Sequence, residues 1–151
     1  MNPPFSPVFV SKTAWLEETD HKFVSGCSDG RFFPARIEFY SVLEILRPDH
    51  IDLPGGVGIF SPTDPFSSEK LDKVKLLHDK HTIEHFFGFS HQGCGYYAEL
   101  YKECSPEQIF SRQVKDLYLF RESMLKIQPK AKVDLFYERP QNGKIEYLHI
   151  D

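Results

Sequence analysis

The stretch VSGCSDGR, residues 24–31, places three different reactive side chains on alternate positions at the end of an apolar run. They are the thiol of Cys27, the carboxylate of Asp29 and the guanidinium of Arg31. A strand would point all three the same way, and a glycine-bearing turn would let them converge on one point. A site at that point would use a thiolate, a carboxylate and a cation together.

A second stretch, FSHQGCG, residues 89–95, adds an imidazole at His91 and another thiol at Cys94. Two thiolates and one imidazole are ligands that zinc selects, and three protein ligands leave one tetrahedral position open, as in catalytic zinc sites. The spacing His91-x-x-Cys94, with glycine at 93 and 95, lets a loop bring both side chains to one ion at about 2.0–2.3 Å. Cys27, His91 and Cys94 are therefore the predicted zinc ligands.

The strands that position these residues are predicted from apolar, β-branched and aromatic runs. They are expected at residues 21–26, at the start of 50–60, at 82–89, at 132–138 and at 144–150. The second of them should run into a tight turn at Pro54, Gly55 and Gly56, and the Asn142-Gly143 pair should close a hairpin between the last two.

Helices are predicted between these strands, at residues 34–46, from 64 onward, at 97–103 and at 106–127. Pro34 opens the first helix, and Ser105 with Gln108 forms a capping box for the last. Asp64 suits an N-cap, before a helix whose apolar residues recur every three positions.

This alternation predicts an α/β fold, with a mostly parallel central sheet of about four to five strands flanked by helices and a C-terminal hairpin or antiparallel edge strand. Ligands of such sheets bind beyond the carboxyl ends of the strands. Both VSGCSDGR and FSHQGCG follow predicted strands, so the fold would bring them together.

The pattern C-x-D-x-R at Cys27, Asp29 and Arg31, followed by H-x-x-C at His91 and Cys94, resembles the β-class carbonic anhydrases. The similarity runs in order through roughly residues 20–125, and the closing strand near residues 144–148 is similar too. The resemblance implies zinc at the cysteine and histidine positions, reversible hydration of carbon dioxide to bicarbonate by zinc-bound hydroxide, and a homodimer or higher homo-oligomer with sites near the interface.

The chain also departs from the pattern of that family. It has little room before residue 21 for helices that embrace a partner subunit, it carries Pro54-Gly55-Gly56 where the family has N-A-G, and no glutamine precedes Cys27. Two other functions therefore stay open. One is zinc-dependent hydrolysis of carbonyl sulfide or carbon disulfide, and the other is a catalytically silent zinc protein.

Each predicted role has a plainer alternative. Asp29 would accept a hydrogen bond from the nucleophile while Arg31 keeps it ionised and away from the metal, but the two could be only a surface ion pair. Gly55 and Gly56 would let substrate approach, or would simply make a turn. The cysteines could be buried apolar residues, or could form a closed zinc knot with Cys104 or Asp29 as fourth ligand.

Another candidate zinc motif is HTIEH, residues 81–85, which fits the H-x-x-E-H pattern of some proteases. That pattern requires a helix that places both histidines on one face. The β-branched and aromatic residues favour a strand instead, which would hold His81 and His85 about 13 Å apart. The motif is therefore not expected to bind an ion.

The 151 residues suit one compact domain, predicted as an arm at 1–18 and a single zinc-binding α/β domain at 19–151. A net charge of −4 without a basic cluster predicts no nucleic-acid or membrane partner, only a small molecule such as carbon dioxide or bicarbonate. Three cysteines and no recognisable export signal predict a cytoplasmic protein with metal or thiol chemistry, in which Cys104 is a free thiol.

Overall fold

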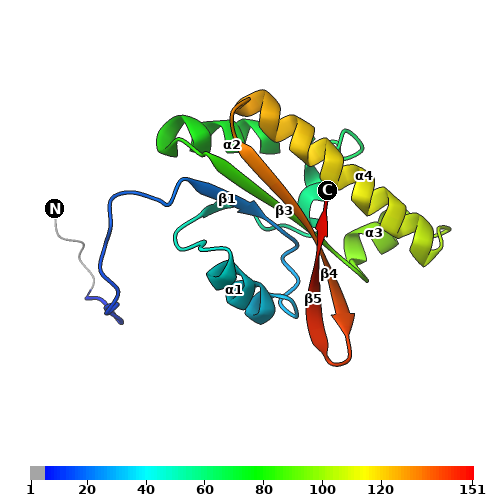
Figure 1. Ribbon diagram of the computed structural model, residues 1–151, viewed down its shortest axis with the longest axis horizontal. Helices are drawn as coiled ribbons and strands as arrows, with labels where there is room; N and C mark the ends of the chain where they lie inside the picture. Colours follow the sequence, from blue (N-terminus) through cyan, green and yellow to red (C-terminus); the bar gives the residue numbers. More distant parts are fainter. Residues whose placement is uncertain (1–5) are drawn as a thin grey trace.

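The computed structural model describes residues 6–151, which build one five-stranded sheet in the order β2-β1-β3-β4-β5 (Figure 1). The strands are β1 (Lys22–Ser25), β2 (Asp49–His50), β3 (His85–His91), β4 (Lys132–Gln141) and β5 (Lys144–Ile150). The first four are parallel, and β5 pairs antiparallel with β4 at the edge. The predicted mostly parallel sheet with a C-terminal hairpin is confirmed.

Helices cover both faces of this sheet (Figure 1). They are α1 (Phe33–Val42), α2 (Ser67–His81), α3 (Gly95–Leu100), α4 (Pro106–Ile127) and the 3-10 helix η1 (Gly56–Phe60). The first lies on one face, and α2, α4 and η1 pack on the other. The predicted capping box of α4 is present, since the Ser105 side chain accepts from the Gln108 amide at 3.3 Å and Gln108 accepts from the Ser105 amide at 2.8 Å.

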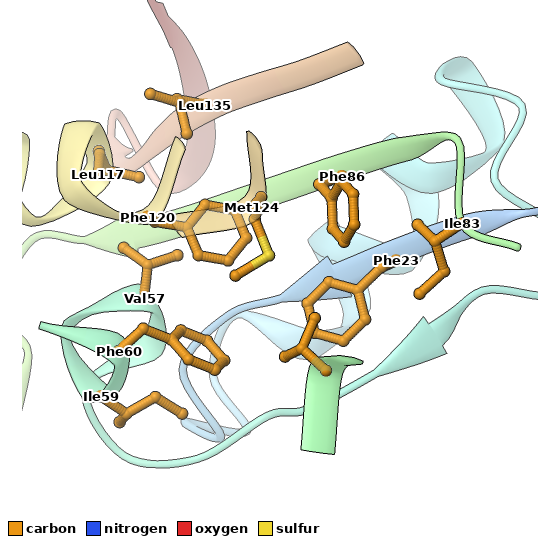
Figure 2. Packing of buried hydrophobic residues seen from close by; sticks show 11 residues of the cluster. Phe23, Val57, Ile59, Phe60, Ile83, Phe86, Leu117, Phe120, Met124 and Leu135 are labelled. Atoms are coloured by element: carbon orange, nitrogen blue, oxygen red, sulfur yellow. The ribbon is translucent and has the colours of Figure 1, made fainter. Parts of the chain in front are cut away.

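The larger apolar core lies between the sheet and the α2–α4 layer (Figure 2). Phe23 and Phe86 come to it from neighbouring strands, Phe60 comes from η1, and Phe120 and Met124 come from α4. All five are almost fully buried. Each such side chain contributes about 1.5–3 kcal/mol by leaving water, so this core holds η1, and with it the turn before η1, against the sheet.

The opposite face carries a smaller core under α1. Val24, Phe87 and Phe89 are one position removed from the residues that point into the larger core, because successive strand residues face opposite sides. Phe39 of α1 meets Phe136 edge to face, with ring centroids 5.0 Å apart. This contact fixes α1, which directly follows the segment 26–31.

Three predicted boundaries on the first half of the chain are wrong. The helix predicted from residue 64 begins at Ser67, because the Asp64 side chain accepts from the Phe66 amide at 2.9 Å in a turn that precedes the helix. The helix predicted for residues 34–46 ends at Val42, because Glu44 takes a left-handed conformation and the Ile45 amide bonds back to the Tyr40 carbonyl at 2.8 Å. This is a Schellman end made without glycine. The second strand has only two residues, and the predicted turn follows it, with positive φ at Gly55 and Gly56.

The third strand lies further along the chain than predicted. It begins at His85 rather than at residue 82, since Thr82 is the left-handed C-cap of α2, and it extends to His91 rather than stopping at residue 89. The hairpin turn at Asn142-Gly143 agrees with the prediction, with both residues at positive φ.

The N-terminal part that the structure describes, residues 6–18, contains no helix or strand. Residues 1–5 of the arm predicted for 1–18 lie outside the described residues. Between residues 6 and 151, no helix combines the length and the apolarity needed to cross a bilayer.

Candidate metal centre

The two predicted ligand segments meet because β1 and β3 are parallel neighbours. Ser25, the last residue of β1, pairs with Gly88, so β3 continues three residues further, to His91. Cys27 follows the end of β1, and Cys94 is the N-cap of the short helix α3. All three therefore lie at the carboxyl edge of the sheet, where parallel α/β folds bind ligands.

The ligand atoms of Cys27, His91 and Cys94 lie within 4.8 Å of one another, and all three residues are buried. The two sulfurs are 4.0 Å apart. Two sulfurs that share one tetrahedral ion at about 2.3 Å each would lie about 3.8 Å apart, so the observed separation suits a single ion. The structure brings the predicted ligand set together.

The ring of His91 is oriented as a metal ligand requires. Its Nδ1 lies 2.9 Å from the carbonyl oxygen of Gln92, and because a carbonyl can only accept, Nδ1 carries the proton. Its Nε2 is buried and has no hydrogen-bond partner within residues 6–151. A buried ring nitrogen without a hydrogen-bond partner, beside two sulfurs, fits a zinc ligand, because metal-bound histidines commonly donate their other N–H to a carbonyl.

The two sulfurs share charge unequally. Contact with Cys94 lowers the pKa of Cys27 to about 3, although burial opposes this, and the amides of Gly55 and Asp29 lower it further. The same contact, together with burial, raises the pKa of Cys94. These opposite shifts favour a thiolate at Cys27 beside a thiol at Cys94, and a divalent cation would displace the thiol proton and bind both sulfurs as thiolates.

Asp29 and Arg31 form a bidentate ion pair beside Cys27. Nε of Arg31 lies 3.0 Å from Oδ1 of Asp29, and Nη2 lies 2.6 Å from Oδ2. The Arg31 backbone amide also donates to Oδ1, at 3.0 Å. These hydrogen bonds lower the pKa of Asp29 to about 2, although burial opposes the shift. The carboxylate is therefore ionised and held in one orientation.

The turn at Gly55 and Gly56 packs against the same segment. A Cβ on Gly56 would lie 2.5 Å from the carbonyl oxygen of Phe89 and 3.1 Å from the amide of Cys27, and one on Gly55 would lie 2.6 Å from the ring of Tyr96. Both residues also have positive φ. Close backbone packing and conformation thus require glycine at both positions, and the turn lies directly against Cys27.

Sequence reasoning missed the residues that support the ligands from behind. Gln113 of α4 donates to the His91 carbonyl at 2.8 Å and accepts from the Tyr137 hydroxyl at 3.2 Å. Arg36 and Glu138 form a buried ion pair behind Cys27. The sequence carries one sign of such residues, namely a polar residue within an otherwise apolar helix or strand pattern, but it does not show what that residue contacts.

The remaining candidates do not join the centre. His81 ends α2 and lies 2.7 Å from Asp49, whereas His85 begins β3 and lies 2.6 Å from Asp134, so they share no helical face. The strand expected to hold both includes only His85. Cys104 is a free, exposed thiol in the turn before α4.

Solved structures that resemble this chain in fold include β-carbonic anhydrases. That of the fungal pathogen Aspergillus fumigatus is 14% identical, with a TM-score of 0.53 over 87% of this chain and 76% of its own. That of Trichomonas vaginalis, isoform I, is 14% identical, with a TM-score of 0.55 over 92% and 88%. One of two tetrameric enzymes from Sordaria macrospora is 13% identical, with a TM-score of 0.55 over 87% and 81%.

Sequence comparison adds no relative to these: no family model matches the chain, and no curated protein is significantly similar to it. The structural similarity shows a divergent fold of the β-carbonic anhydrase type. The resemblance in fold that the sequence motifs predict is confirmed.

Proposed function

We propose that this chain is a zinc-dependent carbonic anhydrase that interconverts carbon dioxide and bicarbonate. The observation that carries this proposal is the buried group of Cys27, His91 and Cys94 beside the bidentate Asp29–Arg31 pair, at the carboxyl edge of a sheet with this topology. The fold alone would not specify a reaction.

The ligand set would leave one position of a tetrahedral zinc ion open, as catalytic sites do. A zinc ion bound there would act as a Lewis acid and lower the pKa of a water molecule from 15.7 toward roughly 7–9. The water molecule would first lose a proton to solvent, and the hydroxide would then add to the carbon of carbon dioxide, forming one C–O bond as the π bond of one C=O group breaks to give bicarbonate.

The protein's part in this reaction is orientation. The remaining O–H of the nucleophilic oxygen would donate a hydrogen bond to Asp29, which would direct a lone pair of that oxygen toward the substrate carbon. Arg31 would hold Asp29 ionised and turned away from the metal, because both carboxylate oxygens accept from its guanidinium. Without Arg31, the carboxylate could become a fourth ligand and close the site.

Gly55 and Gly56 would form the substrate-facing wall beside Cys27. A side chain on Gly56 would collide with the Phe89 carbonyl, and one on Gly55 would collide with the Tyr96 ring, so only bare backbone lets this turn lie against Cys27.

We also propose that the chain forms a homo-oligomer in the cytoplasm. Phe33 and Ile37 on α1 are large apolar residues with 59% and 47% of their surfaces exposed, which suits a subunit interface. Its three cysteines are all free, as is usual in a reducing compartment.

The test is metal content and carbon dioxide hydration on the same purified, never-chelated sample. We expect about one zinc per chain by elemental analysis, and hydration in a stopped-flow assay with a pH indicator. Activity on carbonyl sulfide or carbon disulfide without hydration would reassign the substrate. Stoichiometric zinc with neither activity would indicate a silent zinc protein, and a metal-free, inactive chain would contradict the proposal.

A further inference from the structure

An ion pair between Arg36 of α1 and Glu138 of β4 is buried beneath the proposed zinc site. The two side chains are 3% and 0% exposed. Nε of Arg36 donates to one carboxylate oxygen at 3.1 Å, and Nη2 donates to the other at 2.5 Å. Such a pair loses most of its hydration on folding, and it contributes little net stability compared with apolar residues of similar size. Its presence at this position therefore needs another explanation.

The third nitrogen of the guanidinium reaches a proposed ligand. Nη1 of Arg36 donates to the backbone carbonyl of Cys27 at 2.9 Å. The guanidinium also packs against the preceding residue, since a Cβ on Gly26 would lie 2.6 Å from Nη1. The planar group thus fixes the backbone from which the Cys27 side chain projects.

Glu138 connects the same guanidinium to the second ligand. It is the register partner of His91 on the neighbouring strand, and its backbone carbonyl accepts from the Gln92 amide at 3.0 Å. Arg36 therefore bridges two segments, one carrying Cys27 and the other paired with the end of β3. These segments are distant in sequence and would otherwise meet only through the sheet.

We propose that Arg36 and Glu138 are positioning residues that hold Cys27 and His91 at the separation that zinc requires. This inference rests on the proposed zinc site and adds to it two residues that do not touch the metal. An arginine suits the role because its fork makes three directed hydrogen bonds at once, two to Glu138 and one to Cys27. An apolar pair would fill the same volume without directing the Cys27 carbonyl.

The test compares the double variant Arg36→Met, Glu138→Met with a matched control, Arg139→Met, Glu146→Met. The control removes the same two residue types from the ion pair between Arg139 of β4 and Glu146 of β5. The side chains of that pair are 41% and 43% exposed. Replacing a buried ion pair by apolar residues commonly preserves the fold. Zinc affinity is measured by competition with a chromophoric chelator, and the ligand geometry is read from the absorption spectrum of the cobalt(II)-substituted chain.

We expect the buried double variant to bind zinc about 10- to 100-fold more weakly, with an altered cobalt spectrum and an unchanged far-UV circular dichroism spectrum, while the control matches the wild type. The variant Arg36→Lys serves as the second test, because lysine keeps the charge but cannot bond Glu138 and Cys27 together in this geometry. It too should bind zinc more weakly, and it decides the matter where the double variant does not fold.

Wild-type affinity and an unchanged cobalt spectrum in the folded double variant would overturn the proposal, as would an equal loss in the surface control. A wild-type chain that binds no divalent metal would refute the zinc site itself, and with it both the proposed function and this inference. The two failures are therefore distinguishable.

Discussion

Two arginines close to Cys27 in sequence pair with carboxylates in opposite surroundings. Arg31 is 77% exposed and pairs with Asp29, two residues away. Arg36 is 3% exposed and pairs with Glu138, which is 102 residues away. The chemical groups are almost the same, so the comparison separates what an ion pair does on the surface from what it does inside the protein.

The surface pair contributes little to stability, because solvent screens exposed charges. Its value lies in geometry, since Arg31 fixes both oxygens of Asp29 beside the proposed metal. The buried pair is different, because removing one partner leaves the other charge without solvent or counter-ion. Burial opposes the charge of Arg36, but its bonds to Glu138 outweigh that effect and raise the pKa of the guanidinium. In the proposed function, the exposed Asp29–Arg31 pair, or outer pair, orients a catalytic carboxylate, and the buried Arg36–Glu138 pair, or inner pair, holds the backbone of the ligands.

The largest effect is expected from breaking the inner pair on one side. Arg36→Ala should lower the free energy of unfolding by about 3–5 kcal/mol, because Glu138 stays buried without its partner and a cavity is added. Chemical denaturation followed by circular dichroism measures this loss. The control is Arg139→Ala, which breaks the exposed Arg139–Glu146 pair beside Glu138 on β4. It should lower the free energy of unfolding by less than about 1 kcal/mol. Equal losses in both variants would mean that burial does not distinguish the two pairs.

A loss of turnover without a loss of fold is expected from breaking the outer pair. Asp29→Asn removes the charge that accepts from the nucleophile, and it should lower carbon dioxide hydration by about 10- to 100-fold while zinc content stays unchanged. Asp79→Asn is the matched control, because Asp79 is also a carboxylate held by an exposed cation, Lys75, at 2.7 Å. Near-normal turnover in Asp29→Asn would contradict the role assigned to Asp29.

The same comparison explains how much the sequence could predict. Asp29 and Arg31 lie two positions apart, so their pairing is local and could be read from one stretch. The ligands Cys27, His91 and Cys94 required more, namely that the strands preceding them be parallel neighbours, and that followed from the alternation of strands and helices. The meeting of these three ligands at the carboxyl edge of the sheet could therefore be predicted once the fold class had been predicted.

Arg36 and Glu138 could not be paired in this way. Both are charged residues, which usually face solvent, and the apolar residues around them in the sequence do not identify a partner 102 positions away. The left-handed Glu44 that ends α1 was hidden for a similar reason, because helix ends of this kind usually carry glycine. In both cases tertiary contacts override what the residue type favours, and a single sequence does not reveal those contacts.

The smallest effect concerns the ionisation of Asp29. Its pKa lies near 2 in the folded chain against 3.8 ordinarily, so the stability that the pair contributes is present above about pH 4 and is lost as the pH falls toward 2. Arg31→Ala should return the pKa of Asp29 toward 3.8. Carbon-13 NMR of the carboxyl group then measures the change: at pH 4 the carboxyl should be fully ionised in the wild type and partly protonated in the variant.

Asp79 provides the internal reference for that titration, because Lys75 lowers its pKa independently of Arg31. Its signal should titrate identically in both proteins. If Asp29 also titrated identically, its low pKa would not come from Arg31, and the carboxylate would have to be held by another group. The proposed role of Arg31 in orienting Asp29 would then be wrong. The proposed role of the Arg36–Glu138 pair would stand, because it does not depend on the ionisation of Asp29.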